Sequence, residues 1–275
     1  MKTTFIFVHG FGCDVDSWRY QVDALSPTFA VATLDLPGHG RSPLPKVHSL
    51  ASLAGAVVQA KSHCEGPVIL VGHSMGCRVV LETFRQSPDG VAGIALIDGS
   101  ATGREHAPRL LQLLRDRLRS QGMPALLREN VEGMFTPNSP AQLRVAAIAK
   151  AACLDPIFAE NVLKDLAQWD AVEALHPLVQ ARLPLLGIQA TTLGADMHRR
   201  PLGPGETSEW GALMRRLIPL ARMRDVEGVG HFVQLEAAQL VNEELMSFGS
   251  FSRAFQACRI SRPLAPPIAR SMRDN

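Results

Sequence analysis

The chain has 275 residues, of which 46% are hydrophobic, and its 28 lysines and arginines against 26 aspartates and glutamates leave a formal net charge of +2. This length is compatible with one α/β domain, and the apolar content is sufficient for a large core. The nearly balanced charge implies no basic surface, so nucleic acid is excluded as an expected partner. No apolar run reaches the roughly 20 residues that a membrane-spanning helix requires, so no membrane partner is expected either.

The five cysteines are odd in number and scattered, without the spacing of a zinc site or a disulfide framework. Free thiols suit a reducing compartment. The chain opens directly into a strand-like run at residues 5–8, whereas a secretory signal would have a longer apolar region and a small-residue cleavage site. We therefore expect a cytoplasmic protein, and no residue pattern specifies its oligomeric state.

Short apolar runs alternate along the chain with helical patterns, an order typical of a parallel sheet with helices on both faces. Nearly all of the runs are continuously apolar, as strands buried on both faces should be. The pattern predicts an α/β fold with a mostly parallel central sheet. The expected strands are residues 4–8, 30–34, 68–71, 93–97, 185–189 and 221–226, and the helices between them include 50–62, 75–86 and 237–248.

Residues 101–181 interrupt this alternation with several amphipathic helical stretches, among them 109–119 and 156–169. Because strands of one sheet flank the segment, we expect an insertion that lies over the sheet's edge as a helical lid. The core would then consist of residues 1–100 and 182–250. Residues 251–275 are rich in arginine and proline with little apolar periodicity, which predicts a flexible tail.

A G-x-S-x-G motif centred on Ser74 joins the apolar run 68–71 to a helical pattern. In such a motif the serine occupies a sharp strand-to-helix turn, which projects its hydroxyl above the sheet. Gly72 and Gly76 leave space for the neighbouring strand and helix, and the helix N-terminus directs N–H groups at a developing anion. An ordinary glycine turn would carry the same residues, but the flanking strand and helix favour Ser74 as a nucleophile.

The expected base is His231, one of nine histidines. It follows the last expected strand after a Gly-Val-Gly sequence and precedes a helix rich in leucine and valine. From such a loop an imidazole can reach back over the sheet to Ser74 and accept its proton. His9, His39 and His73 lie in loops near the site that we expect to be structural.

A glycine-rich turn at residues 9–12 follows the first expected strand. Acyl transfer needs two N–H groups directed at one oxygen. We expect the backbone N–H groups of Phe11 and Met75 to form this oxyanion hole. Taken alone, the turn has the simpler interpretation of an ordinary glycine turn.

The stretches FVHGFG, DLPGHGRS, GHSMG and GVGHF, in this order over residues 1 to about 250, resemble the α/β-hydrolase superfamily. The resemblance implies the order serine, acid, histidine, a lid domain, and no metal or organic cofactor. Cys77 stands where many relatives have a second glycine. We interpret it as a small buried packing residue inside the helix, facing away from Ser74.

The acid of the triad has two candidates. In most of the family it follows the penultimate strand, where this chain has Thr191 and Thr192 and no carboxylate before Asp196. The other known placement, after the strand that follows the nucleophile helix, offers Asp98. A buried carboxylate there could hold the His231 Nδ1–H, although an aspartate at a strand end often only caps the loop. We favour Asp98 over Asp196.

These residues predict a serine hydrolase that cleaves a carboxylic ester, thioester or lactone through an acyl-enzyme on Ser74. Serine at this position excludes the members of the fold with a nucleophilic aspartate. There are three alternatives. One is a cofactor-free dioxygenase, because the dioxygenases of this fold have their acid after the same strand as Asp98. The others are a C–C bond hydrolase, although these commonly have asparagine where this chain has His73, and a non-catalytic ligand receptor.

The expected partner is a small molecule with an apolar acyl or aromatic group. This expectation rests on large apolar residues of the lid, although such residues more often form the packing of the lid itself: Met123, Met134, Phe135, Phe158 and Trp169. Arg199 and Arg200 follow the penultimate strand. They could meet an anionic substrate, but we expect a solvated pair.

Overall fold

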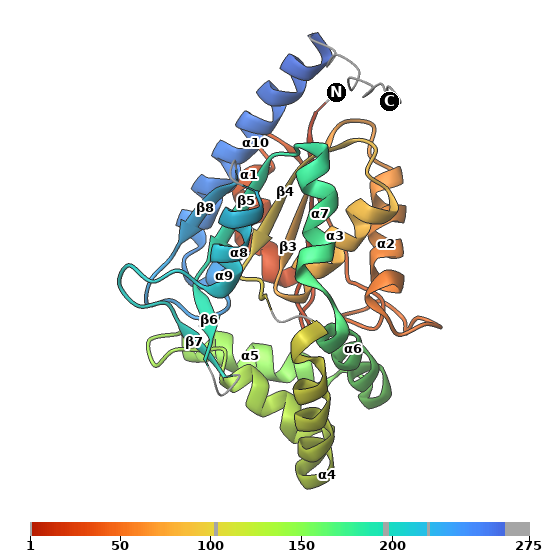
Figure 1. Ribbon diagram of the computed structural model, residues 1–275, viewed down its shortest axis with the longest axis vertical. Coiled ribbons are helices and arrows are strands. Elements are labelled where there is room, and N and C mark those ends of the chain that lie inside the picture. The colour runs from red at the N-terminus through yellow and green to blue at the C-terminus, as the bar shows by residue number, and fades with distance from the viewer. Residues whose placement is uncertain (1, 102–103, 195–197, 219–220, 262–275) are drawn as a thin grey trace, which may run out of the picture.

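The computed structural model describes residues 2–101, 104–194, 198–218 and 221–261. Within them, six parallel strands form one sheet in the order β2-β1-β3-β4-β5-β8 (Figure 1). These strands confirm the predicted mostly parallel sheet, and their ends lie within two residues of the expected ones. Their bounds are β1 (Thr4–Val8), β2 (Ala30–Thr33), β3 (Val68–His73), β4 (Val91–Ile97), β5 (Leu185–Gln189) and β8 (Arg222–Asp225).

The central strands are buried on both faces. Along β1, Phe5 and Phe7 belong to one apolar cluster, whereas Ile6 and Val8 belong to another. Successive side chains of a strand point to opposite faces, so the two clusters lie on the two sides of the sheet. This arrangement accounts for the continuous apolar runs, because neither face of these strands meets solvent.

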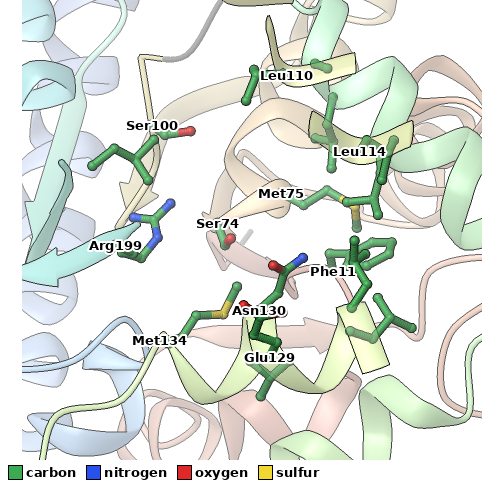
Figure 2. Close-up of a pocket in the computed structure, with 18 of the residues that line it drawn as sticks. Phe11, Ser74, Met75, Ser100, Leu110, Leu114, Glu129, Asn130, Met134 and Arg199 are labelled. Carbon is green, nitrogen blue, oxygen red and sulfur yellow. The ribbon is translucent and has the colours of Figure 1, made fainter. Parts of the chain in front are cut away.

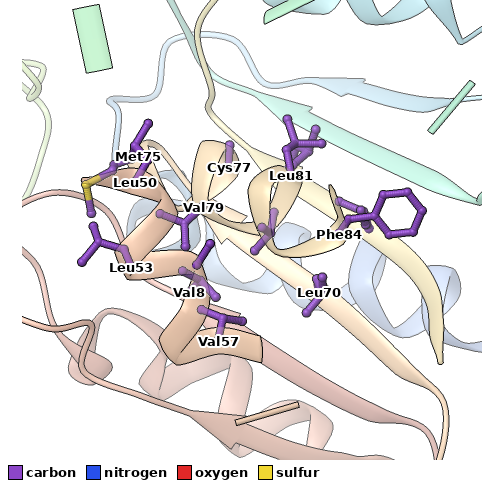
Figure 3. Packing of buried hydrophobic residues seen from close by; sticks show 14 of the residues in the cluster. Val8, Leu50, Leu53, Val57, Leu70, Met75, Cys77, Val79, Leu81 and Phe84 are labelled. Carbon is purple, nitrogen blue, oxygen red and sulfur yellow. The ribbon is translucent and has the colours of Figure 1, made fainter. Parts of the chain in front are cut away.

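Helices cover both faces of the sheet (Figure 1). On the Ile6 and Val8 face, α2 (Leu50–Ser62) and α3 (Met75–Gln86) pack against the strands through the side chains shown in Figure 3. On the other face lie α1 (Arg19–Leu25) and the long α10 (Ala238–Ser261). The helices α7 (Ala171–Ala181) and α8 (Glu209–Leu217) lie on the same face as α2 and α3, whereas the short α9 (Val233–Glu236) lies on the face of α1 and α10.

Between β4 and β5 the chain forms α4 (Ala107–Glu132), α5 (Ala141–Ala152) and α6 (Pro156–Gln168) before α7. These three helices lie together beyond one end of the sheet, and we call them the helical cover (Figure 1). In contrast, α7 contacts α3, and its leucines join the apolar cluster of the sheet. The division into a core and a lid at residues 101 and 181 stays a prediction.

Two further features lie near the ends of the sheet. A hairpin of β6 (Thr191–Leu193) and β7 (Arg199–Pro201) follows β5. At the C-terminal end, α10 continues to Ser261, so a helix occupies the first part of the segment for which the sequence predicts a tail. The reason is packing, because Ser252 is fully buried beside Gly93 of β4. Residues 262–275 of the expected tail lie outside the described residues.

Candidate active site

Ser74 stands on a strained turn between β3 and α3. Its φ of 55° and ψ of −118° lie in a region that non-glycine residues rarely adopt, as expected for a nucleophile on a strand-to-helix elbow. A Cβ at Gly72 would overlap the backbone of Gly76, and a Cβ at Gly76 would overlap the carbonyl oxygen of Val8. Both glycines are therefore required by close backbone approach. The Ser74 N–H donates to the Ile97 oxygen at 2.9 Å, which ties the turn to β4.

The Ser74 side chain faces a cavity of about 320 Å³ between the end of the sheet and the helical cover (Figure 2). Phe11, Met75 and Leu114 lie on one side of Ser74, and Ser100 and Arg199 lie on the other. Of the lid residues expected to form an apolar pocket, Met134 lines this cavity. The other four, Met123, Phe135, Phe158 and Trp169, are not part of its lining and contact their neighbours in the fold.

Asp98 directly follows β4 and is completely buried. Its Oδ1 accepts hydrogen bonds from the backbone N–H groups of Ala190 (2.8 Å) and Thr191 (2.9 Å). Its Oδ2 accepts from the Thr191 hydroxyl at 2.5 Å and from His231 Nδ1 at 2.6 Å. The fold thus brings Asp98 and His231 together across 133 residues. The other candidate, Asp196, lies outside the described residues.

The two partners of this hydrogen bond have shifted pKa values. Burial raises the pKa of Asp98, but the hydrogen bond and charge of His231, with the charge of Arg199, hold it below its ordinary value. Burial lowers the pKa of His231 to about 4; Arg199 acts in the same direction and Asp98 opposes it. At neutral pH His231 is therefore an uncharged ring that donates Nδ1–H to Asp98 and has its Nε2 lone pair available for a proton.

The backbone of His231 is held from two sides. Its N–H donates to the Met134 oxygen at 2.9 Å, and its carbonyl accepts from His73 Nε2 at 2.9 Å. Among the described residues there is no hydrogen bond between the Ser74 hydroxyl and the His231 ring. Such bonds are often long until substrate binds and tightens them.

The glycine-rich turn lies directly against the elbow, since a Cβ on Gly10 would be 3.2 Å from Ser74 Cβ. His9 fixes this turn by donating from Nδ1 to the Gly10 oxygen at 2.8 Å and accepting the Leu36 N–H at Nε2. Burial lowers the pKa of His9 to about 4, which keeps the ring in the neutral form that this acceptor role needs. The structural role expected of His9 agrees with these contacts.

The two expected oxyanion donors flank Ser74. Met75 is the first residue of α3, so its N–H has no partner within the helix. Phe11 lines the cavity in the turn beside Ser74. Cys77 is buried and donates to the Gly72 and Ile97 oxygens, and burial raises the pKa of its thiol to about 12. This is the packing residue expected from the sequence.

Two residues near Asp98, Thr191 and Arg199, contribute to the site in ways that the sequence does not predict. Thr191 stands where most relatives have the acid, and here its N–H and hydroxyl bind the carboxylate of Asp98 instead. Arg199 is the second. The expectation of a solvated pair is wrong for this residue, because its side chain is only 14% exposed and lies 3.5 Å from Asp98 Oδ2. Successive side chains of β7 point to opposite sides, so Arg199 lies inward and the exposed Arg200 outward.

Within the described residues, no group of three or more His, Cys, Asp or Glu side chains is arranged to hold a metal ion. Nor does any helix there have the length and apolar content needed to cross a bilayer.

Residues 5–244 match the model of the Alpha/beta hydrolase family, so the chain belongs to this family. Over 255 residues it is 28% identical to the dihydrolipoyllysine-residue acetyltransferase component of the acetoin cleaving system of Pseudomonas putida, covering 90% of this chain and 63% of that relative. It is also 39% identical over 95 residues to the pimeloyl-[acyl-carrier protein] methyl ester esterase of Methylococcus capsulatus, covering 34% of this chain and 36% of the esterase. The chain thus spans less than two thirds of the length of each of these relatives.

Solved structures of esterases and lactonases share the fold. A thermophilic esterase from Thermogutta terrifontis has a TM-score of 0.74 at 20% identity, covering 91% of this chain and 90% of the esterase. The enol-lactonase from Burkholderia xenovorans has a TM-score of 0.73 at 21% identity, covering 90% and 91% respectively. At these identities the likeness concerns the fold alone.

Proposed function

We propose that this chain is a serine hydrolase that cleaves a carboxylic ester, thioester or lactone through an acyl-enzyme on Ser74. The observation that carries the proposal is the 2.6 Å hydrogen bond between His231 Nδ1 and the buried Asp98, beside a serine on a strained elbow. Membership of a hydrolase family with esterase and lactonase neighbours supports the same reaction class.

In the first half of the reaction, His231 Nε2 takes the Ser74 proton while Oγ adds to the substrate carbonyl carbon. Asp98 stabilises the imidazolium that forms and holds the ring in the required tautomer. The negative oxygen of the tetrahedral intermediate accepts hydrogen bonds from the N–H groups of Phe11 and Met75. The intermediate collapses when the leaving alcohol, thiol or lactone oxygen takes the proton from His231, which leaves the acyl group on Ser74.

In the second half, water attacks the acyl carbonyl carbon. His231 takes the proton of this water, and the same two N–H groups hold the second oxyanion. Collapse breaks the bond to Ser74 Oγ, which recovers its proton from His231, and the carboxylic acid leaves. The cavity volume of about 320 Å³ is at the small end for ligand sites, which favours a small acyl compound.

The test is intact-mass measurement after treatment with a fluorophosphonate, which reacts with activated serines without any knowledge of the substrate. We expect one stoichiometric adduct on the wild type and none on Ser74→Ala. Ser87→Ala, at the far end of the helix that Ser74 begins, is the matched control and should be labelled like the wild type. A folded wild type without an adduct would overturn the proposal and favour the dioxygenase or receptor alternatives.

A further inference from the structure

Two consecutive arginines of β7 have opposite surroundings. Arg200 is 53% exposed and is paired with Glu206 through two bonds, of 2.6 and 2.8 Å. Arg199 is largely buried, and its side chain lines the same cavity as Ser74. Figure 2 shows its guanidinium directed into that cavity, next to Ser100. A guanidinium in a small cavity with many leucines in its wall calls for an explanation, because burying a charge is unfavourable unless it is compensated.

The contacts of Arg199 within the protein compensate it only in part. Its Nη1 donates to the Thr191 hydroxyl oxygen at 2.7 Å and lies 3.5 Å from Asp98 Oδ2. That carboxylate oxygen already accepts shorter bonds from Thr191 and His231. Among the described residues, the hydrogen bond and the ion pair of Arg199 both use Nη1, whereas a guanidinium has five N–H donors on three nitrogens. Burial lowers the pKa of Arg199, which shows that its surroundings disfavour the charge.

Two other arginines line the cavity, and both have partners in the protein. Arg117 is paired with Glu129 at 2.6 Å. Arg78 donates to the Leu166 carbonyl and the Ser100 hydroxyl and lies over the Trp169 ring, and the charge of Asp165 acts on it. Arg199 is the arginine of this wall that lies beside the Asp98 and His231 pair.

We propose that the substrate of this site carries a carboxylate, and that Arg199 binds it while the ester or lactone carbonyl lies at Ser74. This inference rests on the proposed function and narrows it to the half-esters and lactones of short dicarboxylic or related acids. A planar guanidinium matches a carboxylate with two parallel N–H···O bonds. The carboxylate would offset the buried charge of Arg199, and the leucines of the helical cover would contact the methylene chain between the two ends.

The experiment compares monomethyl glutarate with dimethyl glutarate, which have the same chain and the same methyl ester but differ in one negative charge. We expect the wild type to prefer the monoester by about tenfold or more in kcat/KM, since a hydrogen-bonded charge typically contributes this much. Arg199→Gln should bring the ratio near one, mainly by raising KM for the monoester. Arg199→Lys should keep part of the preference for the monoester, because lysine retains the positive charge but cannot form the bidentate hydrogen bonds of arginine.

Taking the ratio of two substrates on one variant cancels any general effect of Arg199 on Asp98 and His231. Arg200→Gln is the matched control, one residue away on the exposed side of the hairpin, and should keep the wild-type ratio. A ratio that is the same in the wild type and in Arg199→Gln would overturn the inference, as would a wild type that prefers the dimethyl ester. Either result leaves the hydrolase proposal intact.

A second measurement does not depend on turnover. Glutarate itself should slow the labelling of Ser74 by the fluorophosphonate in the wild type but not in Arg199→Gln, and the neutral dimethyl ester should protect less. If neither ester is hydrolysed, the protection measurement decides alone. Equal protection of the wild type and of Arg199→Gln by glutarate would then contradict the inference. Absence of labelling in the wild type would instead overturn the proposed function, so the two failures are distinguishable.

Discussion

The cavity of Ser74 has two walls of different construction, the carboxyl edge of the sheet and the helical cover. At the edge, Gly72 and Gly76 leave no room for a Cβ, and Asp98 receives four hydrogen bonds. The cover instead supplies several half-buried leucines, and its long α4 bends at Gly122, where a Cβ would meet only Pro124, at 3.9 Å. Changes at the edge should therefore abolish the reaction, whereas changes in the cover should alter which molecule enters.

The largest effect is expected from Asp98→Asn. The amide cannot accept the His231 Nδ1–H in the same way or stabilise the imidazolium, so kcat should fall by roughly 10⁴-fold, as in other serine triads. Ester hydrolysis and fluorophosphonate labelling rates measure this loss. The matched control for this loss is Asp225→Asn, because it changes a carboxylate that is paired with Arg215 away from the cavity. Equal activity of Asp98→Asn and the wild type would remove Asp98 from the mechanism.

The next effect concerns space at the edge. Gly76→Ala should destabilise the fold by about 3 kcal/mol or more, because the new methyl group overlaps the backbone of β1 and neither chain can move freely. Gly55→Ala is the matched substitution, in α2 with no atom within 4 Å of the new Cβ, and should stabilise by about 0.5–1 kcal/mol. Urea unfolding of both variants gives the comparison. Similar free energies of unfolding would show that the elbow tolerates expansion.

A further effect on stability is expected from pH. Four buried histidines stand at the edge, and burial lowers their pKa values: His9 and His231 to about 4, His39 and His73 to about 3. The unfolded chain binds protons at these residues from about pH 6.5 downward, whereas the folded chain does not. Stability is therefore present above pH 6.5 and lost progressively as pH falls toward 4. Melting temperatures at pH 7.5 and 5.0 that coincide would contradict this.

The smallest effect should come from the helical cover. Leu114→Ala removes part of the cavity wall from a half-exposed side chain, so we expect KM for an apolar acyl ester to rise about fivefold, or ~1 kcal/mol, with kcat nearly unchanged. Val145→Ala, on an exposed position of α5 outside the cavity, should leave both constants unchanged. A large fall in kcat for Leu114→Ala would show that the cover also sets the geometry of the reaction.

The sequence predicts the sheet and the elbow at Ser74 because both depend on local features: apolar runs and obligatory glycines. It favours Asp98 over Asp196 as the partner of His231 through the family resemblance, since the two residues are 133 positions apart. It does not predict that Thr191 binds the Asp98 carboxylate, because this contact joins residues 93 positions apart. The burial of Arg199 is missed for a related reason. A three-residue strand is too short for its alternation to be recognised without the fold.

The position of the proposed acid, Asp98, directly after β4 has a consequence for how this protein can diverge. Ser74 and Asp98 both belong to one β-α-β unit, residues 68–98, so a single contiguous piece of chain would encode nucleophile and acid together. The hairpin after β5 then does not need to supply a carboxylate, and it contributes Thr191 and Arg199 to the surroundings of Asp98. Replacement of β7 while Thr191 is kept becomes a direct way to exchange the charge that the cavity presents, with the reacting residues left in place.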